Sequence, residues 1–152
     1  MRALGRRTRR LEDARLITGR GRYTDDIHIP GMLHGALVRS PVAHGLLRGI
    51  DAGAALALEG VHGVLTAADL TALGVGELRV NWVHPGQRNS SNPVLAVDRV
   101  YYVGHPVAIL VAESHYIAED AAELVVLDID ELPAAVATED ALAADAPLLY
   151  PD

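Results

Sequence analysis

The stretch "RVYYVGHPVAILVAESHYIAEDAAELVVLDIDELP", residues 99–133, decides the fold class. The runs "VLAVDRVYYVG" (94–104) and "PVAILVAES" (106–114) are rich in β-branched residues and predict two strands. The run "VVLDIDELP" (125–133) alternates apolar and acidic residues and predicts a third strand. A helical pattern separates the last two runs. This order predicts one layered α+β sheet with helices packed against it.

The helical pattern begins after Ser114, whose hydroxyl is a good N-cap acceptor. Small apolar residues then fall on one helical face: Ala118, Ala121, Ala122 and Val125. Acidic residues point away from that face: Glu119, Asp120 and Glu123. We therefore expect an amphipathic helix whose alanine face lies close to the sheet.

Shorter elements are predicted upstream. Residues 31–40 read as a strand with no cleanly polar face, which predicts a strand covered on both sides. The pattern further predicts a strand, a short helix and a strand over residues 45–50, 52–58 and 61–65. Thr66 and Asp69 fit a capping box, which starts a helix that Gly74 ends. Residues 76–93 predict a long loop, and residues 138–143 a short acidic helix.

The two apolar runs of the opening stretch meet at Gly104-His105-Pro106. Glycine permits close backbone approach and proline fixes a turn, so the corner could present the His105 ring to a ligand. No neighbouring residue supplies the partner that would orient this ring for acid–base chemistry. The corner is therefore interpreted as a structural turn, and a functional turn is the minor alternative.

Composition restricts the class of protein. The chain has 152 residues, is 50% hydrophobic and lacks Phe, which predicts one globular domain with an aliphatic core. The absence of cysteine excludes disulfides, thiolate zinc sites and iron–sulfur clusters ligated by this chain alone. No apolar run resembles a signal peptide or reaches the length of a membrane span. These features predict a cytoplasmic protein.

Charge is unevenly placed along the chain. The net charge is −7, yet eight arginines lie within the first 22 residues. A basic arm can bind nucleic acid, an anionic ligand or an acidic protein surface. No aromatic residue precedes Tyr23, so base stacking is poorly served and a protein partner is favoured. The predicted partner interface comprises Arg6, Arg7, Arg9 and Arg10.

No catalytic, metal or cofactor site is complete in the sequence. None of the seven histidines forms a metal motif such as H-E-x-x-H, so surface or turn positions are expected for His28, His34, His44, His62, His84, His105 and His115. Gly19-x-Gly21 lacks the third glycine of a dinucleotide fingerprint, since Thr24 stands there. We predict no catalytic, cofactor-binding or metal-ligating residue in this chain.

Four segments in order resemble the start of the large subunit of molybdenum hydroxylases, the family of xanthine dehydrogenase, aldehyde oxidase and carbon monoxide dehydrogenase. They are "RLEDARLITGRGRYTDDIHIPGMLHGALVRSPVAHGLLRGID" (10–51), "GVHGVLTAADL" (60–70), "VLAVDRVYYVGHPVAILVAESHYIAEDAAELVVLDIDELPAAV" (94–136) and "ALAADAPLLYPD" (141–152). The resemblance implies the α/β-hammerhead fold, a mixed sheet with packed helices. It divides the chain into a basic N-terminal arm (1–22), the hammerhead domain (23–136) and a C-terminal helix and tail (137–152).

The resemblance also implies a function. The chain would be the N-terminal domain, or a separately encoded fragment, of an oxidoreductase that hydroxylates an aldehyde or N-heterocycle. The assembled enzyme would carry a molybdopterin-type molybdenum cofactor, with iron–sulfur clusters and FAD in partner domains or subunits. The cofactor loops and the glutamate base of the family lie beyond this sequence, and His105 stands where the family often has Glu or Gln. The alternative is a non-catalytic binding or scaffold module with the same fold.

Overall fold

The computed structural model describes residues 5, 9–78, 82, 84–87 and 92–150. The chain divides into two compact units, residues 1–32 and 33–152, which are described separately. The first unit contains α1 (Asp13–Leu16) and the 3-10 helix η1 (Thr24–Asp26). The basic arm (residues 1–22) therefore contains one helical turn, α1. The Arg15 guanidinium pairs with the Glu12 carboxylate across that turn, an i,i+3 contact that favours helix.

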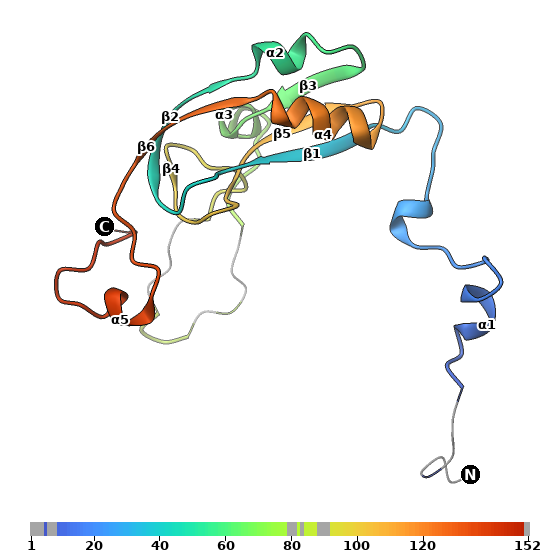
Figure 1. The fold of residues 1–152 in the computed structure, drawn as a ribbon, viewed down its shortest axis with the longest axis horizontal. Helices are drawn as coiled ribbons and strands as arrows, with labels where there is room; N and C mark the ends of the chain where they lie inside the picture. Colours follow the sequence, from blue (N-terminus) through green and yellow to red (C-terminus); the bar gives the residue numbers. More distant parts are fainter. Residues whose placement is uncertain (1–4, 6–8, 79–81, 83, 88–91, 151–152) are drawn as a thin grey trace. The chain divides into compact units, whose positions relative to one another are not determined.

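The second unit contains two three-stranded sheets (Figure 1). The first sheet has the order β1 (His34–Arg39), β5 (Pro106–Ala112) and β3 (Val61–Leu65). The second has the order β4 (Arg99–Val100), β2 (Gly45–Asp51) and β6 (Val126–Glu131). Every pairing among these described strands is antiparallel. The α+β class is confirmed, but the single mixed sheet expected from the sequence is wrong.

Two sheets form because β5 and β6 pair with different strands. The helix α4 (His115–Glu123) joins these strands, yet β5 pairs with β1 and β3 while β6 pairs with β2. Local patterns predict the strands themselves but cannot choose among long-range partners. The predicted strand over 94–104 is also shorter than expected, because only Arg99 and Val100 pair with β2.

The remaining helices are short. They are α2 (Gly53–Leu56), α3 (Ala67–Ala72) and α5 (Thr138–Ala141). The predicted capping box is confirmed, since the Asp69 carboxylate accepts from the Thr66 amide at 2.7 Å. Hydrogen bonds from Thr66 lower the pKa of this carboxyl group. Gly74 follows the helix with φ +76°, the left-handed conformation expected of a glycine at a helix end.

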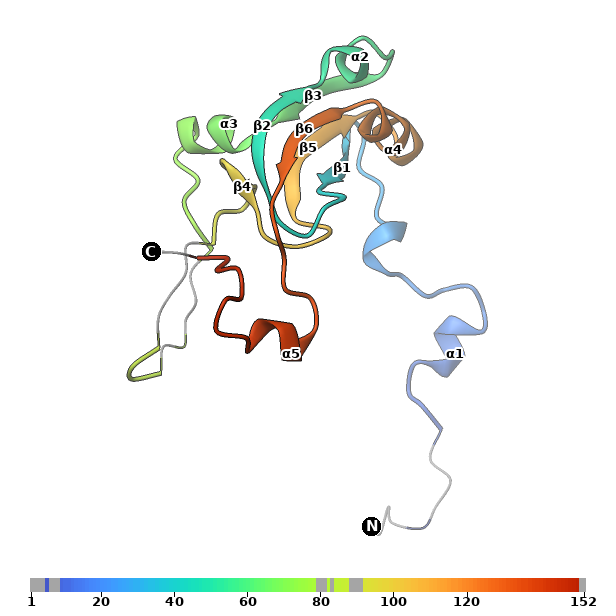
Figure 2. The ribbon, with the colours of Figure 1, turned by 60° about the vertical axis from the view of Figure 1, so that its left-hand side comes forward.

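The core consists of two clusters of small aliphatic side chains. One joins α4 to the first sheet and contains Ala55, Leu110, Ala112, Ala118 and Ala121. The other contains Ala96, Val100 and Val107, with side chains of β2 and β6 packed around it. Figure 1 and Figure 2 show α4 beside β1 and β5 of the first sheet. Small side chains permit this close packing of helix on strand.

The predicted facing of the long helix is confirmed. Ala118 and Ala121 are fully buried, Ala122 is half-buried, and the three acidic residues of the opposite face are exposed. The Ser114 hydroxyl accepts from the Ile117 amide at 3.2 Å, so the predicted N-cap is present. The prediction that the first strand is covered on both faces is wrong, because Leu33 and Leu37 are 44% and 41% exposed.

Candidate functional site

The Gly104-His105-Pro106 corner is tied to the end of β1. Gly104 has φ +87°, as the turn interpretation requires. Its amide donates to the Ser40 carbonyl at 2.8 Å, and the Ser40 amide donates to the His105 carbonyl at 2.9 Å. The Arg39 guanidinium donates to the Gly104 carbonyl at 2.9 Å. These hydrogen bonds therefore join the corner, at the start of β5, to the C-terminal end of β1.

The His105 ring is buried in this corner and is 4% exposed. Its Nδ1 accepts from the Tyr101 amide at 3.3 Å, and its ring stacks on Tyr102 with centroids 4.6 Å apart. Burial lowers the pKa of His105 below its ordinary value, because the charged ring loses hydration. The ring is therefore neutral near pH 7 and fills space between backbone and tyrosines.

A second histidine, His44, is also buried, although the sequence pattern predicts a surface or turn position. Its Nδ1 lies 2.8 Å from the Pro133 carbonyl, and the Arg99 guanidinium lies 3.3 Å from its Nε2. A carbonyl only accepts, so Nδ1 carries the proton and Nε2 accepts from arginine. His44 lies directly before β2, which pairs on both sides, but this pairing cannot be seen in the sequence.

Tyr101 connects the two histidines. Its ring lies between those of His44 and His105, with centroid distances of 6.5 and 5.8 Å, and stacks on Tyr150 at 4.5 Å. This aromatic cluster brings together the corner, the start of β2 and the C-terminal tail. It contains no nucleophile beside a base, so its geometry supports packing rather than acid–base chemistry.

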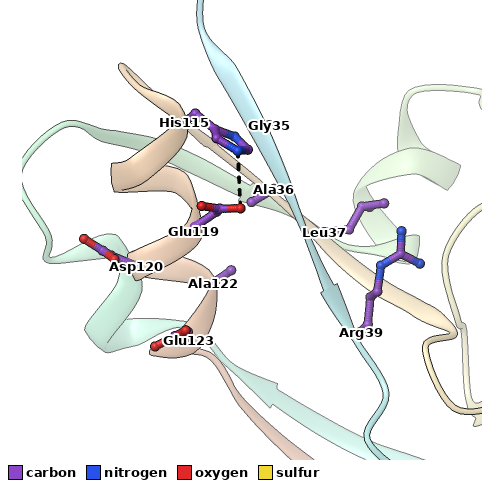
Figure 3. Close-up of a pocket in the computed structure, with 9 residues that line it drawn as sticks. All are labelled: Gly35, Ala36, Leu37, Arg39, His115, Glu119, Asp120, Ala122 and Glu123. Carbon is purple, nitrogen blue, oxygen red and sulfur yellow. Dashed lines mark ion pairs between the residues drawn. The ribbon is translucent and has the colours of Figure 1, made fainter. Parts of the chain in front are cut away.

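A groove runs between β1 and the outer face of α4 (Figure 3). Its lining on the strand side consists of Gly35, Ala36, Leu37 and Arg39, and on the helix side of His115, Glu119, Asp120, Ala122 and Glu123. We call this the β1–α4 groove. His115 Nε2 lies 3.3 Å from a Glu119 carboxylate oxygen. Three carboxylates and one arginine make its surroundings acidic.

Other candidates from the sequence remain separate. Arg9 and Arg10 are exposed, whereas Arg6 and Arg7 lie outside the described residues. Gly19 follows α1 with φ +67°, and no strand precedes it in the described part of residues 1–32, so it lacks the strand–turn–helix setting of a phosphate loop. Within the described ranges, no three His, Cys, Asp or Glu side chains are grouped to hold a metal.

The family model described as "Aldehyde oxidase and xanthine dehydrogenase, a/b hammerhead domain" matches residues 18–133. This range contains both sheets and the corner. The chain belongs to this family. Among the described residues, no helix of this hammerhead domain is long and apolar enough to cross a bilayer.

Relatives of the hammerhead domain are much longer oxidoreductases. The carbon monoxide dehydrogenase large chain of Hydrogenophaga pseudoflava is 47% identical over 93% of this chain, which spans 17% of that relative. The nicotine 6-hydroxylase large subunit of Paenarthrobacter nicotinovorans is 46% identical over 85% of this chain and 16% of its own length. The crystal structure of a Cu,Mo-CO dehydrogenase matches with a TM-score of 0.81 at 41% identity, over 95% of this chain and 18% of that one. The hammerhead domain thus corresponds to a small part of a molybdenum hydroxylase large subunit.

Proposed function

We propose that this chain is the N-terminal domain, or a separately encoded fragment, of a molybdenum-dependent hydroxylase and supports the cofactor-binding part of the large subunit. The observation that carries the proposal is the 47% identity over 93% of the chain to one large chain, together with the family match over residues 18–133. The assembled enzyme would insert water-derived oxygen into an aldehyde or an N-heterocycle. Electrons would leave through iron–sulfur clusters and FAD in partner domains or subunits.

We expect the molybdenum cofactor to be held outside the described residues. Among these residues no three His, Cys, Asp or Glu side chains are grouped as in a metal site, and the buried His44 and His105 are engaged with a backbone carbonyl and a backbone amide. The role proposed for this domain is therefore to pack and position, and no chemical step is assigned to its residues. The corner fits this role, because backbone hydrogen bonds join it to the end of β1, and ring contacts of His105 join it to the tyrosines of the aromatic cluster.

Metal analysis tests the proposal. The 152-residue chain, expressed where the cofactor is made, should be folded, colourless and inactive in dye reduction with an aldehyde or purine. The assembled large subunit should carry molybdenum and reduce the dye. Stoichiometric molybdenum on the isolated chain after gel filtration would contradict the proposal. An assembled subunit without molybdenum would favour the alternative, a non-catalytic scaffold with the same fold.

The cellular location and the partners follow the same proposal. We expect the assembled enzyme in the cytoplasm, with iron–sulfur and flavin subunits as partners and no nucleic acid bound. The exposed Arg9 and Arg10 support a basic surface on the arm. Fractionation of native cells, followed by detection of molybdenum and flavin with the chain, tests both expectations.

A further inference from the structure

The inference concerns the outer edge of β1, which no described strand pairs. β1 pairs with β5 alone, so alternate amides and carbonyls along His34–Val38 face away from the sheet without a partner strand among the described residues. An edge of this kind is a template for another strand, and proteins usually protect it.

The other three sheet edges carry such protection, and β1 does not. β6 presents Asp128, Asp130 and Glu131. β3 is interrupted by a register shift between Val61 and Gly63, and β4 has only two residues. β1, with the sequence HGALVR, has no proline or lysine and is regular up to Val38. Its one charged residue, Arg39, is bonded to the Gly104 carbonyl.

The side chains beside this edge restrict which kind of segment could pair with β1. The β1–α4 groove has an acidic wall of exposed Glu119, Asp120 and Glu123, while Leu37 on the strand side is 41% exposed (Figure 3). An extended segment that pairs with β1 would bring alternate side chains toward this wall and toward Leu37. Lysine or arginine at the first set of positions and apolar residues at the second would complement the groove.

We propose that an extended, basic and apolar segment from the cofactor-binding remainder of the large subunit adds a strand to β1 and covers the β1–α4 groove. This inference rests on the proposed function. The chain spans only 17% of a relative's length, so a long stretch of large subunit is available as the occupant. A second copy of the chain is disfavoured, because pairing of β1 with its own copy would bring two acidic walls together. Phosphate groups of a nucleic acid would meet the same repulsion.

Hydrogen exchange of backbone amides is the first test. We expect peptides covering residues 33–40 to exchange about tenfold or more slowly in the assembled large subunit than in the isolated 152-residue chain. Peptides covering β3 at the opposite edge are the internal reference and should change little. Equal exchange of β1 in an assembled, molybdenum-containing subunit would overturn the strand addition and leave the proposed function standing. Absence of any assembly would overturn both.

Charge reversal is the second test. Glu119→Lys with Glu123→Lys should reduce the amount of assembled large subunit about tenfold, because both positions face the incoming segment. Glu139→Lys with Asp140→Lys on α5 makes the same charge change at exposed positions outside the groove and should assemble normally. Equal assembly of the two variants would overturn the proposed complementarity. Protection of β1 that rises with concentration of the isolated chain would identify a second copy as occupant and also overturn the inference.

Discussion

Within the corner, Gly104 and His105 contribute in different ways. Gly104 supplies a backbone conformation at φ +87° that other residues rarely adopt, whereas His105 fills a buried space with a neutral ring. The His105 ring contacts the Tyr101 amide, the Tyr102 ring and, at a longer centroid distance of 5.8 Å, the Tyr101 ring. None of these contacts requires proton transfer. The turn therefore requires the backbone conformation of Gly104, whereas the His105 side chain serves only to fill space.

Gly104→Val should destabilise the domain by about 1–3 kcal/mol, because a β-branched residue at positive φ is strained. Gly63→Val is the matched control, since Gly63 lies in β3 without positive φ and a Cβ there would meet nothing within 4 Å. Thermal and denaturant unfolding of both variants measures the difference. Equal stability of the two variants would show that Gly104 is not required by the turn.

His105→Gln should leave the turnover of the assembled enzyme close to that of the parent, since glutamine can also accept from the Tyr101 amide. The free energy of unfolding should fall by no more than about 1 kcal/mol. A loss of turnover of roughly a hundredfold with unchanged stability would instead identify His105 as a catalytic residue.

The same variant should alter the pH dependence of unfolding. Burial lowers the pKa of His105 in the folded state below 6.5, so the unfolded chain binds more protons as the pH falls. The stability linked to His105 is complete above pH 6.5 and decreases as the pH falls below that value toward the folded-state pKa. Urea titrations from pH 7.5 to 5 should show a shallower decrease for His105→Gln. Parallel curves would indicate that the ring is hydrated.

The position of α4 depends on the size of its buried side chains. Ala118 and Ala121 are fully buried and allow the helix to lie close to β1 and β5. The opposite face of the same helix carries the acidic wall of the groove. One helix thus contributes to both the core and the proposed docking surface.

Ala121→Glu should cost about 3 kcal/mol or more, because it buries an unpaired charge in a packed interface. Tyr116→Glu introduces the same residue on the same helix at a position that is 78% exposed, and it should be nearly neutral. Unfolding followed by circular dichroism gives the comparison. If both variants melt like the parent, the assigned facing of α4 is wrong.

Across the whole molecule, two surfaces of opposite charge are expected to bind partners. The arm is basic and the β1–α4 groove is acidic, so each should select a partner surface of opposite sign. The boundaries 1–22, 23–136 and 137–152 stay predictions. The arm is expected to bind protein rather than nucleic acid.

Replacement of Arg6, Arg7, Arg9 and Arg10 by Ser should weaken co-purification of the chain with the remainder of the large subunit or with a partner subunit. The removed guanidinium groups would otherwise pair with acidic groups of that partner. Pull-down at physiological salt compares the variant with the parent. Submicromolar binding of duplex DNA by the parent, lost in the variant, would favour a nucleic-acid module instead.

Much of the local structure could be predicted from the sequence. Alternation and capping residues predicted the β3, β5 and β6 strands, the Ser114 N-cap and the Thr66 capping box, because these depend on residues a few positions apart. The spacing of alanines predicted the buried face of α4 for the same reason. The family could also be identified, because the order of several weak motifs is specific when each alone is not.

Tertiary structure decided what depends on distant residues. Local alternation did not reveal that β5 and β6 belong to different sheets, since partner choice rests on contacts between segments far apart in the chain. It did not reveal that His44 is buried against the Pro133 carbonyl, 89 residues away. The open edge of β1 could not be predicted either, because an apolar strand has the same sequence pattern whether it pairs with one strand or with two. The sequence by itself determined the local elements and the family, while the pairing of strands determined the free edge and therefore the proposed docking surface.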